Sequence, residues 1–196
     1  MSKRIANIQR KTRETDISAT LNIDGSGSST INTGIGFFNH MLEGFAKHGF
    51  FDLDLNCEGD LAVDSHHTIE DCGIVLGNAI KEAIGDKKGI KRFGSCILPM
   101  DETLVLCAVD LCGRPYFQFD LELPASKVGD FDTELVREFF YAVSYKSGMN
   151  LHFKLFSGTN THHIIEAAFK AFAKALDMAT DIDPRNEGVL STKGSL

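Results

Sequence analysis

The chain of 196 residues lacks the features of a membrane or secreted protein. No apolar run approaches the roughly 18 residues that a membrane-spanning helix needs. Basic residues near the N-terminus are followed by no apolar segment, so no secretory signal peptide is predicted. We therefore expect a cytoplasmic protein with no membrane partner.

Thiolate metal sites and nucleic-acid binding are also disfavoured. The sequence has five cysteines but no Cys-x-x-Cys pair, which argues against a thiolate zinc site. Most of these cysteines lie in apolar runs, which is typical of reduced, buried thiols in a cytosol. Acidic residues outnumber basic ones by 27 to 20, and the net charge of −7 lacks the basic excess of a nucleic-acid-binding protein.

One short phrase occurs twice, 96 residues apart: His66-His67-Thr68-Ile69-Glu70 and His162-His163-Ile164-Ile165-Glu166. On a helix, either histidine of each phrase lies close to the glutamate. The two adjacent histidines point about 100° apart, so each is expected to serve a different ion. Imidazole and carboxylate donors without thiolate suit octahedral Mn, Fe or Zn. The duplication thus predicts a dinuclear metal site.

Two further histidines are candidate ligands. His40 lies among large apolar residues, and His152 lies on the polar side of an alternating segment. Alone, either would be read as an ordinary core or surface histidine, and one His-His pair could simply open a helix in solvent. Two pairs with glutamate at the same offset favour metal binding over that reading.

The order of predicted elements also repeats, with a helix, a strand and a His-His helix in each half. Alternating apolar residues predict strands, and apolar residues three or four apart predict helices. We expect an α+β fold formed by tandem duplication, one domain over 1–196 with halves at about 1–90 and 91–196, and antiparallel or mixed sheets covered by helices on one face. The predicted strands are 17–23, 51–57, 104–109, 115–121 and 149–155, with another near Leu98, and the predicted helices are 38–45, 69–83, 135–143 and 165–176.

The sequence resembles the imidazoleglycerol-phosphate dehydratases, enzymes of histidine biosynthesis, over nearly its whole length. The order and spacing of several segments carry the resemblance: Arg10–Thr15, Thr33–Leu42, His66–Asp71, Pro99–Glu102, Gly113–Pro115, Gly148–His152, His162–Ala167 and Ser191–Gly194. Asn39 and Ser65 stand where many members have Asp, and Gly44 stands where many have Gln. These departures concern affinity and metal tuning rather than the reaction.

The resemblance implies a hydro-lyase that converts imidazole glycerol phosphate to imidazole acetol phosphate. It implies a tandem-duplicated fold of the ribosomal protein S5 domain 2-like type and two Mn²⁺ ions per subunit at subunit boundaries. It also implies self-association into a trimer-based 24-mer.

The resemblance further assigns site residues by matching positions. The implied metal ligands are His40, His66, His67, Glu70, His152, His162, His163 and Glu166. The implied substrate-binding residues are Glu14, His48, Arg92, Arg114, Ser191 and Lys193. Glu14 is the expected acid–base group, with Glu70 and Glu166 in the catalytic centre.

The reaction explains why two imidazole-rich sites are useful. The substrate must lose water together with a proton from a carbon that no carbonyl activates. Two Lewis acids on the ring nitrogens favour an imidazolate, which expels the hydroxyl through a diazafulvene intermediate. Two alternatives stay open, a dinuclear hydrolase and a metal-storage shell. Imidazoles outnumber carboxylates six to two among the candidate ligands, and this favours binding of an azole.

Overall fold

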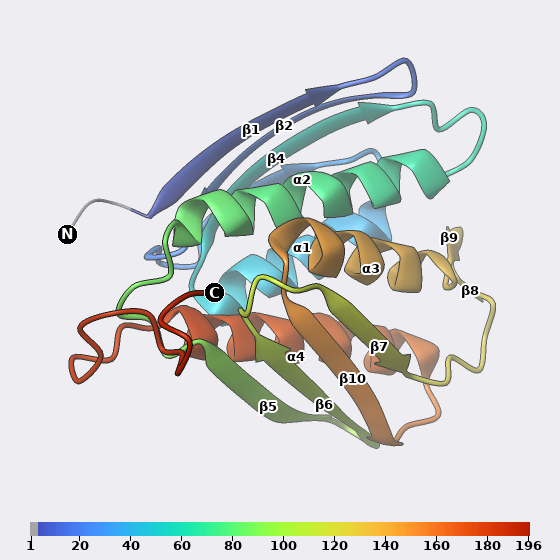
Figure 1. The fold of residues 1–196 in the computed structure, drawn as a ribbon. Helices are drawn as coiled ribbons and strands as arrows, with labels where there is room; N and C mark the ends of the chain where they lie inside the picture. The colour runs from blue at the N-terminus through green and yellow to red at the C-terminus, as the bar shows by residue number, and fades with distance from the viewer. Residues whose placement is uncertain (1–3) are drawn as a thin grey trace.

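The computed structural model describes residues 4–196 as two sheets with four helices between them (Figure 1). The first half contains β1 (Ile5–Lys11), β2 (Thr15–Asn22), β3 (Ser29–Asn32), α1 (Gly36–Gly49), β4 (Asp52–Gly59) and α2 (His66–Ile84). The second half contains β5 (Phe93–Met100), β6 (Thr103–Asp110), β7 (Tyr116–Asp120), α3 (Leu135–Ser147), β10 (Asn150–Ser157) and α4 (Thr161–Thr180). A small hairpin of β8 (Lys127–Val128) and β9 (Phe131–Asp132) precedes α3.

The two sheets have the same topology. Their strand orders are β1-β2-β4-β3 and β5-β6-β10-β7. In each sheet the last pair, β3 with β4 or β7 with β10, is parallel, and the other pairs are antiparallel. The same connections therefore occur twice, which confirms the predicted duplicated α+β fold with mixed sheets.

Each sheet buries one face against helices. In β2 the side chains of Ile17, Ala19 and Leu21 are buried, whereas Asp16 and Ser18 are exposed. This alternation follows from the two-residue period of a strand. Helices α1 and α2 pack against the first sheet, and α3 and α4 pack against the second. The four helices meet in the middle of the molecule (Figure 1). Within the described residues, no helix covers the outer face of either sheet (Figure 1).

Glycines allow the two halves to approach closely. A Cβ atom at Gly73 of α2 would lie 2.6 Å from the carbonyl oxygen of Phe139 in α3, and one at Gly77 would lie 2.8 Å from that of Val143. Both distances are shorter than side chains tolerate, so these positions require glycine at the α2–α3 contact.

Aromatic side chains join the halves into one core. Phe38 of α1 packs edge-on against Phe139 of α3, with ring centroids 5.2 Å apart. Phe45 of α1 stacks on Phe172 of α4 at 5.4 Å. Such pairs add to the free energy of apolar burial. The buried hydrophobic residues form one cluster that spans both halves.

All the predicted helices and strands are present, and the structure adds β1, β3 and the β8–β9 hairpin, which were not predicted. The apolar residues of β1 alternate with polar ones only weakly, because the charged Arg10 takes an inward position. β3 has four residues and lies at a sheet edge. Such short segments carry too little periodicity to predict.

Helices α2 and α4 begin at the same end of the molecule, so the fold places both His-His phrases at that end (Figure 1). No helix of the described residues is both long and apolar enough to cross a membrane.

Candidate metal and substrate site

Both His-His phrases lie in the first turn of a helix. The backbone N–H of His66 donates to Asp64 Oδ1 at 2.7 Å. In α4 the side chain of Asn160 caps the helix and accepts from the N–H groups of His162 and His163. These caps satisfy backbone donors that a helix start leaves unpaired. The imidazoles therefore need not bond to their own helix and can point outward.

Adjacent imidazoles diverge, as predicted. The His66 and His67 rings are 6.1 Å apart and nearly perpendicular, and the second pair has almost the same arrangement. The first histidine of each phrase faces the glutamate, with Nε2 of His66 3.8 Å from Glu70 and Nε2 of His162 3.1 Å from Glu166.

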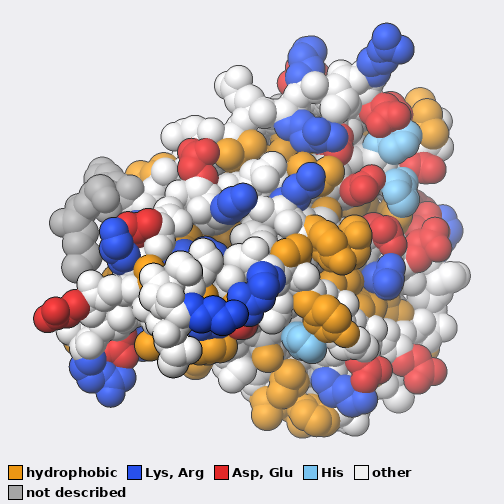
Figure 2. All heavy atoms as spheres, in the orientation of Figure 1, with side chains coloured by type: hydrophobic (Ala, Val, Ile, Leu, Met, Phe, Trp, Pro, Cys, Tyr) orange, Lys and Arg blue, Asp and Glu red, His pale blue; other side chains and the backbone are white. Residues whose placement is uncertain are grey.

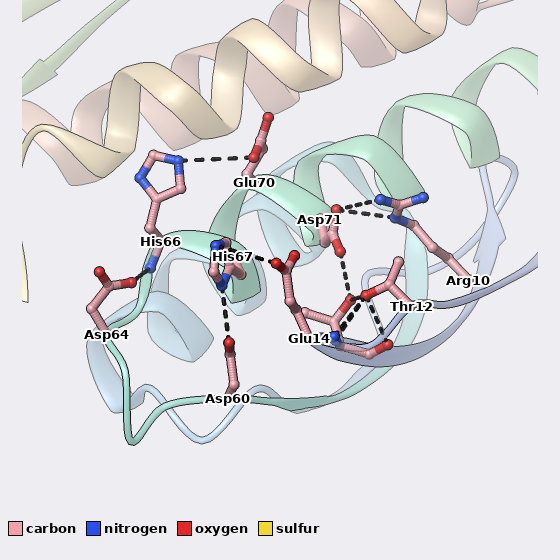
Figure 3. A network of polar contacts seen from close by, with 10 residues as sticks. Arg10, Thr12, Glu14, Asp60, Asp64, His66, His67, Glu70 and Asp71 are labelled. Carbon is pink, nitrogen blue, oxygen red and sulfur yellow. Dashed lines mark hydrogen bonds and ion pairs between the residues drawn. The ribbon is translucent and has the colours of Figure 1, made fainter.

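The second histidine of each phrase is held by a carboxylate from a loop. Nδ1 of His67 donates to Asp60 at 3.0 Å (Figure 3), and Nδ1 of His163 donates to Glu102 at 2.8 Å. These bonds raise the pKa of both histidines. A carboxylate on Nδ1 fixes the tautomer and leaves Nε2 as the free nitrogen, the usual arrangement behind a metal-binding histidine. Asp60 and Glu102 were not predicted to have a role. Glu102 lies 61 residues from His163, and Asp60 lies seven residues before His67, outside its helix, so neither fits a helical spacing.

The described residues include one three-donor group that could hold an ion. Donor atoms of His40, His162 and Glu166 all lie within 4.8 Å of one another. His40 comes from α1, which packs against α4. Lys170 donates to Glu166 Oε1 at 2.6 Å, leaving Oε2 facing the histidines. Burial raises the pKa of Glu166, but the bonds from Lys170 and His162 outweigh it and lower that pKa. Two imidazoles and an ionised carboxylate fit a divalent cation.

The other predicted ligands lie apart from this group. His66 and Glu70 are each 44% exposed, and no third donor joins them among the described residues. His152 lies on the outer face of β10 and stacks on Tyr116 with ring centroids 5.3 Å apart. In a single copy, His152 contacts no other predicted ligand within the described part of the chain.

Glu14 lies in the hairpin between β1 and β2. Its Oε1 atom is 3.8 Å from Nε2 of His67, and its side chain is 53% exposed (Figure 3). In the second half, Asp101 lies in the β5–β6 hairpin at the same distance from Nε2 of His163. Each half thus presents a hairpin carboxylate to the free nitrogen of its second histidine.

Four of the predicted substrate-binding residues line one cavity of about 550 Å³: Arg92, Arg114, Ser191 and Lys193. Arg92 is anchored by a two-point ion pair with Asp110, at 2.7 and 3.1 Å, and this partner raises its pKa. Guanidinium groups, an ammonium and a hydroxyl suit a phosphate monoester.

His48 does not line this cavity. It is half-buried near the end of α1, and its pKa is lowered by burial and by the nearby Lys170 and Lys174. It lies on the helix that carries His40, and Lys170 also contacts Glu166.

The cationic cavity and the three-donor group lie at opposite ends of α4. The N–H of Arg92 donates to the carbonyl of Ala179, near the end of this helix, whereas His162 lies in its first turn. A helix of 20 residues is about 30 Å long. In Figure 2, histidine and acidic side chains gather at the edge where α2 begins, away from the Lys and Arg side chains near the centre of the view.

A duplicated α+β fold with a histidine–carboxylate group that could hold a divalent ion is consistent with a metal-dependent enzyme. Residues 33–176 match the family profile of imidazoleglycerol-phosphate dehydratase. The chain belongs to this family, whose members are hydro-lyases of histidine biosynthesis.

Similar proteins support the assignment over nearly the whole chain. An imidazoleglycerol-phosphate dehydratase from Lachnoclostridium phytofermentans is 64% identical and covers 98% of both chains. One from Acetivibrio thermocellus is 62% identical over 96% of this chain and 97% of its own length. The crystal structure of the Staphylococcus aureus dehydratase has a TM-score of 0.83 at 45% identity, covering 91% of this chain and 99% of that one. The Pyrococcus furiosus structure has a TM-score of 0.85 at 38% identity, covering 96% and 100%.

Proposed function

We propose that this protein dehydrates imidazole glycerol phosphate to imidazole acetol phosphate with two Mn²⁺ ions per chain. The observation that carries the proposal is the combination of an imidazole-rich ligand set with a separate cavity lined by Arg92, Arg114, Ser191 and Lys193. A bridging hydroxide in a hydrolase would favour more carboxylates, and a storage site would not need the cationic cavity.

The ligands would divide between the two ions as the geometry groups them. His40, His162 and Glu166 would hold one ion, and His66 with Glu70 would begin the second group. His67, His152 and His163 would complete the two shells between neighbouring copies, because none of them belongs to a three-donor group within the described residues. Mn²⁺ accepts such nitrogen and oxygen donors.

When bound, the ions would supply the Lewis acidity that the imidazolate and diazafulvene route requires. The residues of the chain would supply the other functions. Glu14 would remove the proton from the second carbon from the ring, next to the carbon that loses the hydroxyl, since its carboxylate lies 3.8 Å from Nε2 of His67. Arg92 and Arg114, with Lys193 and Ser191, would bind the phosphate, and His48 would contact the substrate from α1.

The test is a substrate assay. With Mn²⁺, the protein should consume imidazole glycerol phosphate and form the corresponding ketone phosphate in equal amounts. It should turn over the dephosphorylated diol poorly, because the cationic cavity would then be empty. Release of inorganic phosphate instead of ketone would support the hydrolase, and metal uptake with no turnover would support storage.

Catalysis would require more than one copy of the chain. The cavity and the three-donor group are separated by about the length of α4, roughly 30 Å, far more than an imidazole ring and a three-carbon phosphate can span. We propose that the cavity of one copy works with the ions of another, in a trimer-based 24-mer.

The outer face of the second sheet supports this self-association. Phe93, Ile97 and Tyr116 lie on the same face as His152, and each is more than half exposed. Exposed apolar side chains gathered on one face are typical of protein interfaces.

Removal of metal is therefore expected to shrink the particle. Ions held between copies stabilise the assembled form by mass action, so chelation should favour smaller species and Mn²⁺ should restore the large one. Light scattering with and without chelator measures this. A particle whose mass is unchanged after the metal has been stripped would show that the ions do not hold copies together.

Two further proposals complete this assignment. We propose one domain over 1–196, built of halves at about 1–90 and 91–196, because the topology repeats and one core spans both halves. We also propose a cytoplasmic location, which the five unpaired cysteines of the described chain support.

A further inference from the structure

Asp71 is a buried carboxylate to which the sequence analysis gave no role. It follows Glu70 in α2, and its side chain is 7% exposed. Its Oδ1 atom accepts from Nε and Nη2 of Arg10 at 3.0 and 2.8 Å, and its Oδ2 atom accepts from Oγ1 of Thr15 at 2.5 Å (Figure 3). Arg10 and Thr15 lie on the two strands that flank the β1–β2 turn, so Asp71 ties both strands to α2.

The turn that this tie holds contains Glu14. The hydroxyl of Thr12 accepts from the N–H groups of Glu14 and Thr15, at 3.1 and 3.0 Å. The carbonyl of Glu14 accepts from the N–H of Asp60 at 3.0 Å, and the carboxylate of Asp60 in turn holds His67. The backbone on both sides of Glu14 is therefore fixed relative to the helix that carries His66, His67 and Glu70 (Figure 3).

The repeat shows that the fold itself does not need a carboxylate at position 71. With the 96-residue offset that relates the two His-His phrases, the matching residue of α4 is Ala167, which is fully buried. The matching β5–β6 hairpin is held differently, since Glu102 accepts from the N–H groups of Thr159 and Asn160. A buried ion pair is by itself weak evidence for stability. Asp71 differs from Ala167 in that it anchors a longer turn: the β1–β2 turn lies between the paired residues Lys11 and Asp16, and the β5–β6 turn between Met100 and Thr103.

We propose that Asp71 is a positioning residue that holds Glu14 beside Nε2 of His67 through Arg10 and Thr15. This inference rests on the proposed role of Glu14 as the acid–base group. Without Asp71, the strand pairing and the hydrogen bond from the N–H of Asp60 to the carbonyl of Glu14 remain. The hairpin then loses its side-chain bonds to α2, so the turn can move relative to that helix. The carboxylate of Glu14, half exposed and 3.8 Å from His67, has no other side-chain contact in the described structure that would keep it there.

The first test is Asp71→Asn in the assembled, metal-loaded enzyme. Because a displacement of about 1 Å can cost 10²-fold in rate, we expect kcat to fall by roughly 10- to 100-fold, with KM changed less than about threefold. Metal content should stay at the wild-type value. Hydrogen exchange at the amides of Glu14 and Thr15 should accelerate, which reports on the hairpin independently of activity. Asp16→Asn is the matched control, because Asp16 lies in the same hairpin and its one ion pair in the described structure is with the exposed Lys11. The kinetics and exchange of this variant should be unchanged.

A double-mutant cycle separates positioning from a general structural role. If Asp71 acts through Glu14, adding Asp71→Asn to Glu14→Gln should lower kcat by less than about twofold further, because interacting sites are not additive. An Asp71→Asn effect of equal size in both backgrounds would overturn the positioning role while leaving the role of Glu14 intact. A Glu14→Gln enzyme with wild-type kcat would instead overturn the proposed role of Glu14. If hydrogen exchange at Glu14 and Thr15 is unchanged in Asp71→Asn, Asp71 does not hold the hairpin against α2.

Milder variants keep the test decisive if Asp71→Asn does not fold. Thr15→Val removes one hydrogen bond to Asp71 with little change in shape, and Arg10→Lys keeps the positive charge but loses the two-point contact. Both should lower kcat in the same direction as Asp71→Asn and by less, with Arg10→Lys nearer to wild type than Arg10→Gln. Wild-type kcat and exchange in Thr15→Val and Arg10→Gln together would overturn the proposal.

Discussion

Glu14→Gln is expected to lower kcat by roughly 10²-fold or more, the usual scale for loss of a general acid–base group. Glutamine keeps the size and hydrogen bonding of Glu14 but cannot take a proton. Substrate should still bind, because the proposed ions and the cavity lined by Arg92 and Arg114 would supply the affinity. Steady-state kinetics should therefore show a lower kcat with KM near the wild-type value.

The same variant should retain its metal and its particle size, because Glu14 is not among the proposed ligands. Elemental analysis and light scattering check both properties. Turnover of Glu14→Gln at nearly the wild-type rate would mean that Glu14 is only an exposed residue of the hairpin and that another group moves the proton. Asp101, at the matching position beside His163, would then be the first carboxylate to substitute.

Glu70→Gln should lose metal, assembly and activity together. Wild-type protein purified gently should contain about two divalent ions per chain, chiefly Mn²⁺, since the eight proposed nitrogen and oxygen ligands divide into two shells. A neutral amide is a poorer ligand than a carboxylate, so Glu70→Gln should fall clearly below two ions. A wild-type stoichiometry of one that added Mn²⁺ does not change would count against the dinuclear site.

Two variants calibrate this result. Glu82→Gln lies on the exposed side of the same helix and should keep both ions. Glu166→Gln should lose metal as Glu70→Gln does, yet remain folded, because glutamine can still accept the hydrogen bond from Lys170 at this position. Wild-type metal content in both Glu70→Gln and Glu166→Gln would remove these residues from the ligand set.

Local patterns made much of the fold predictable. The helices that begin at the His-His phrases have regular apolar spacing and are long, so periodicity alone identifies them. β1 was missed because Arg10 occupies an inward position, and the reason lies in its partner Asp71, 61 residues away. A residue that breaks a local pattern to meet a distant charge cannot be interpreted from its neighbours in the sequence.

The same limit applies to the candidate site. Repetition and spacing identified the histidines and glutamates of the two phrases, because those residues lie within one helical turn of each other. Asp60 and Glu102 could not be found in this way, since they meet His67 and His163 only through loop and hairpin geometry. The sequence likewise could not show that His40 approaches Glu166, because that contact depends on the packing of α1 against α4.

The sequence by itself determined the duplicated architecture, the nitrogen and oxygen character of the candidate ligands and the resemblance to the dehydratase family. Each of these depends only on residue type and spacing along the chain. Only the tertiary structure decided which ligands meet within one chain and which side chains position them. It also separated the cationic cavity from the three-donor group by the length of a helix. Those facts arise from packing between elements distant in the chain, where the burial of apolar side chains such as Phe38 and Phe139 sets the geometry and local sequence does not.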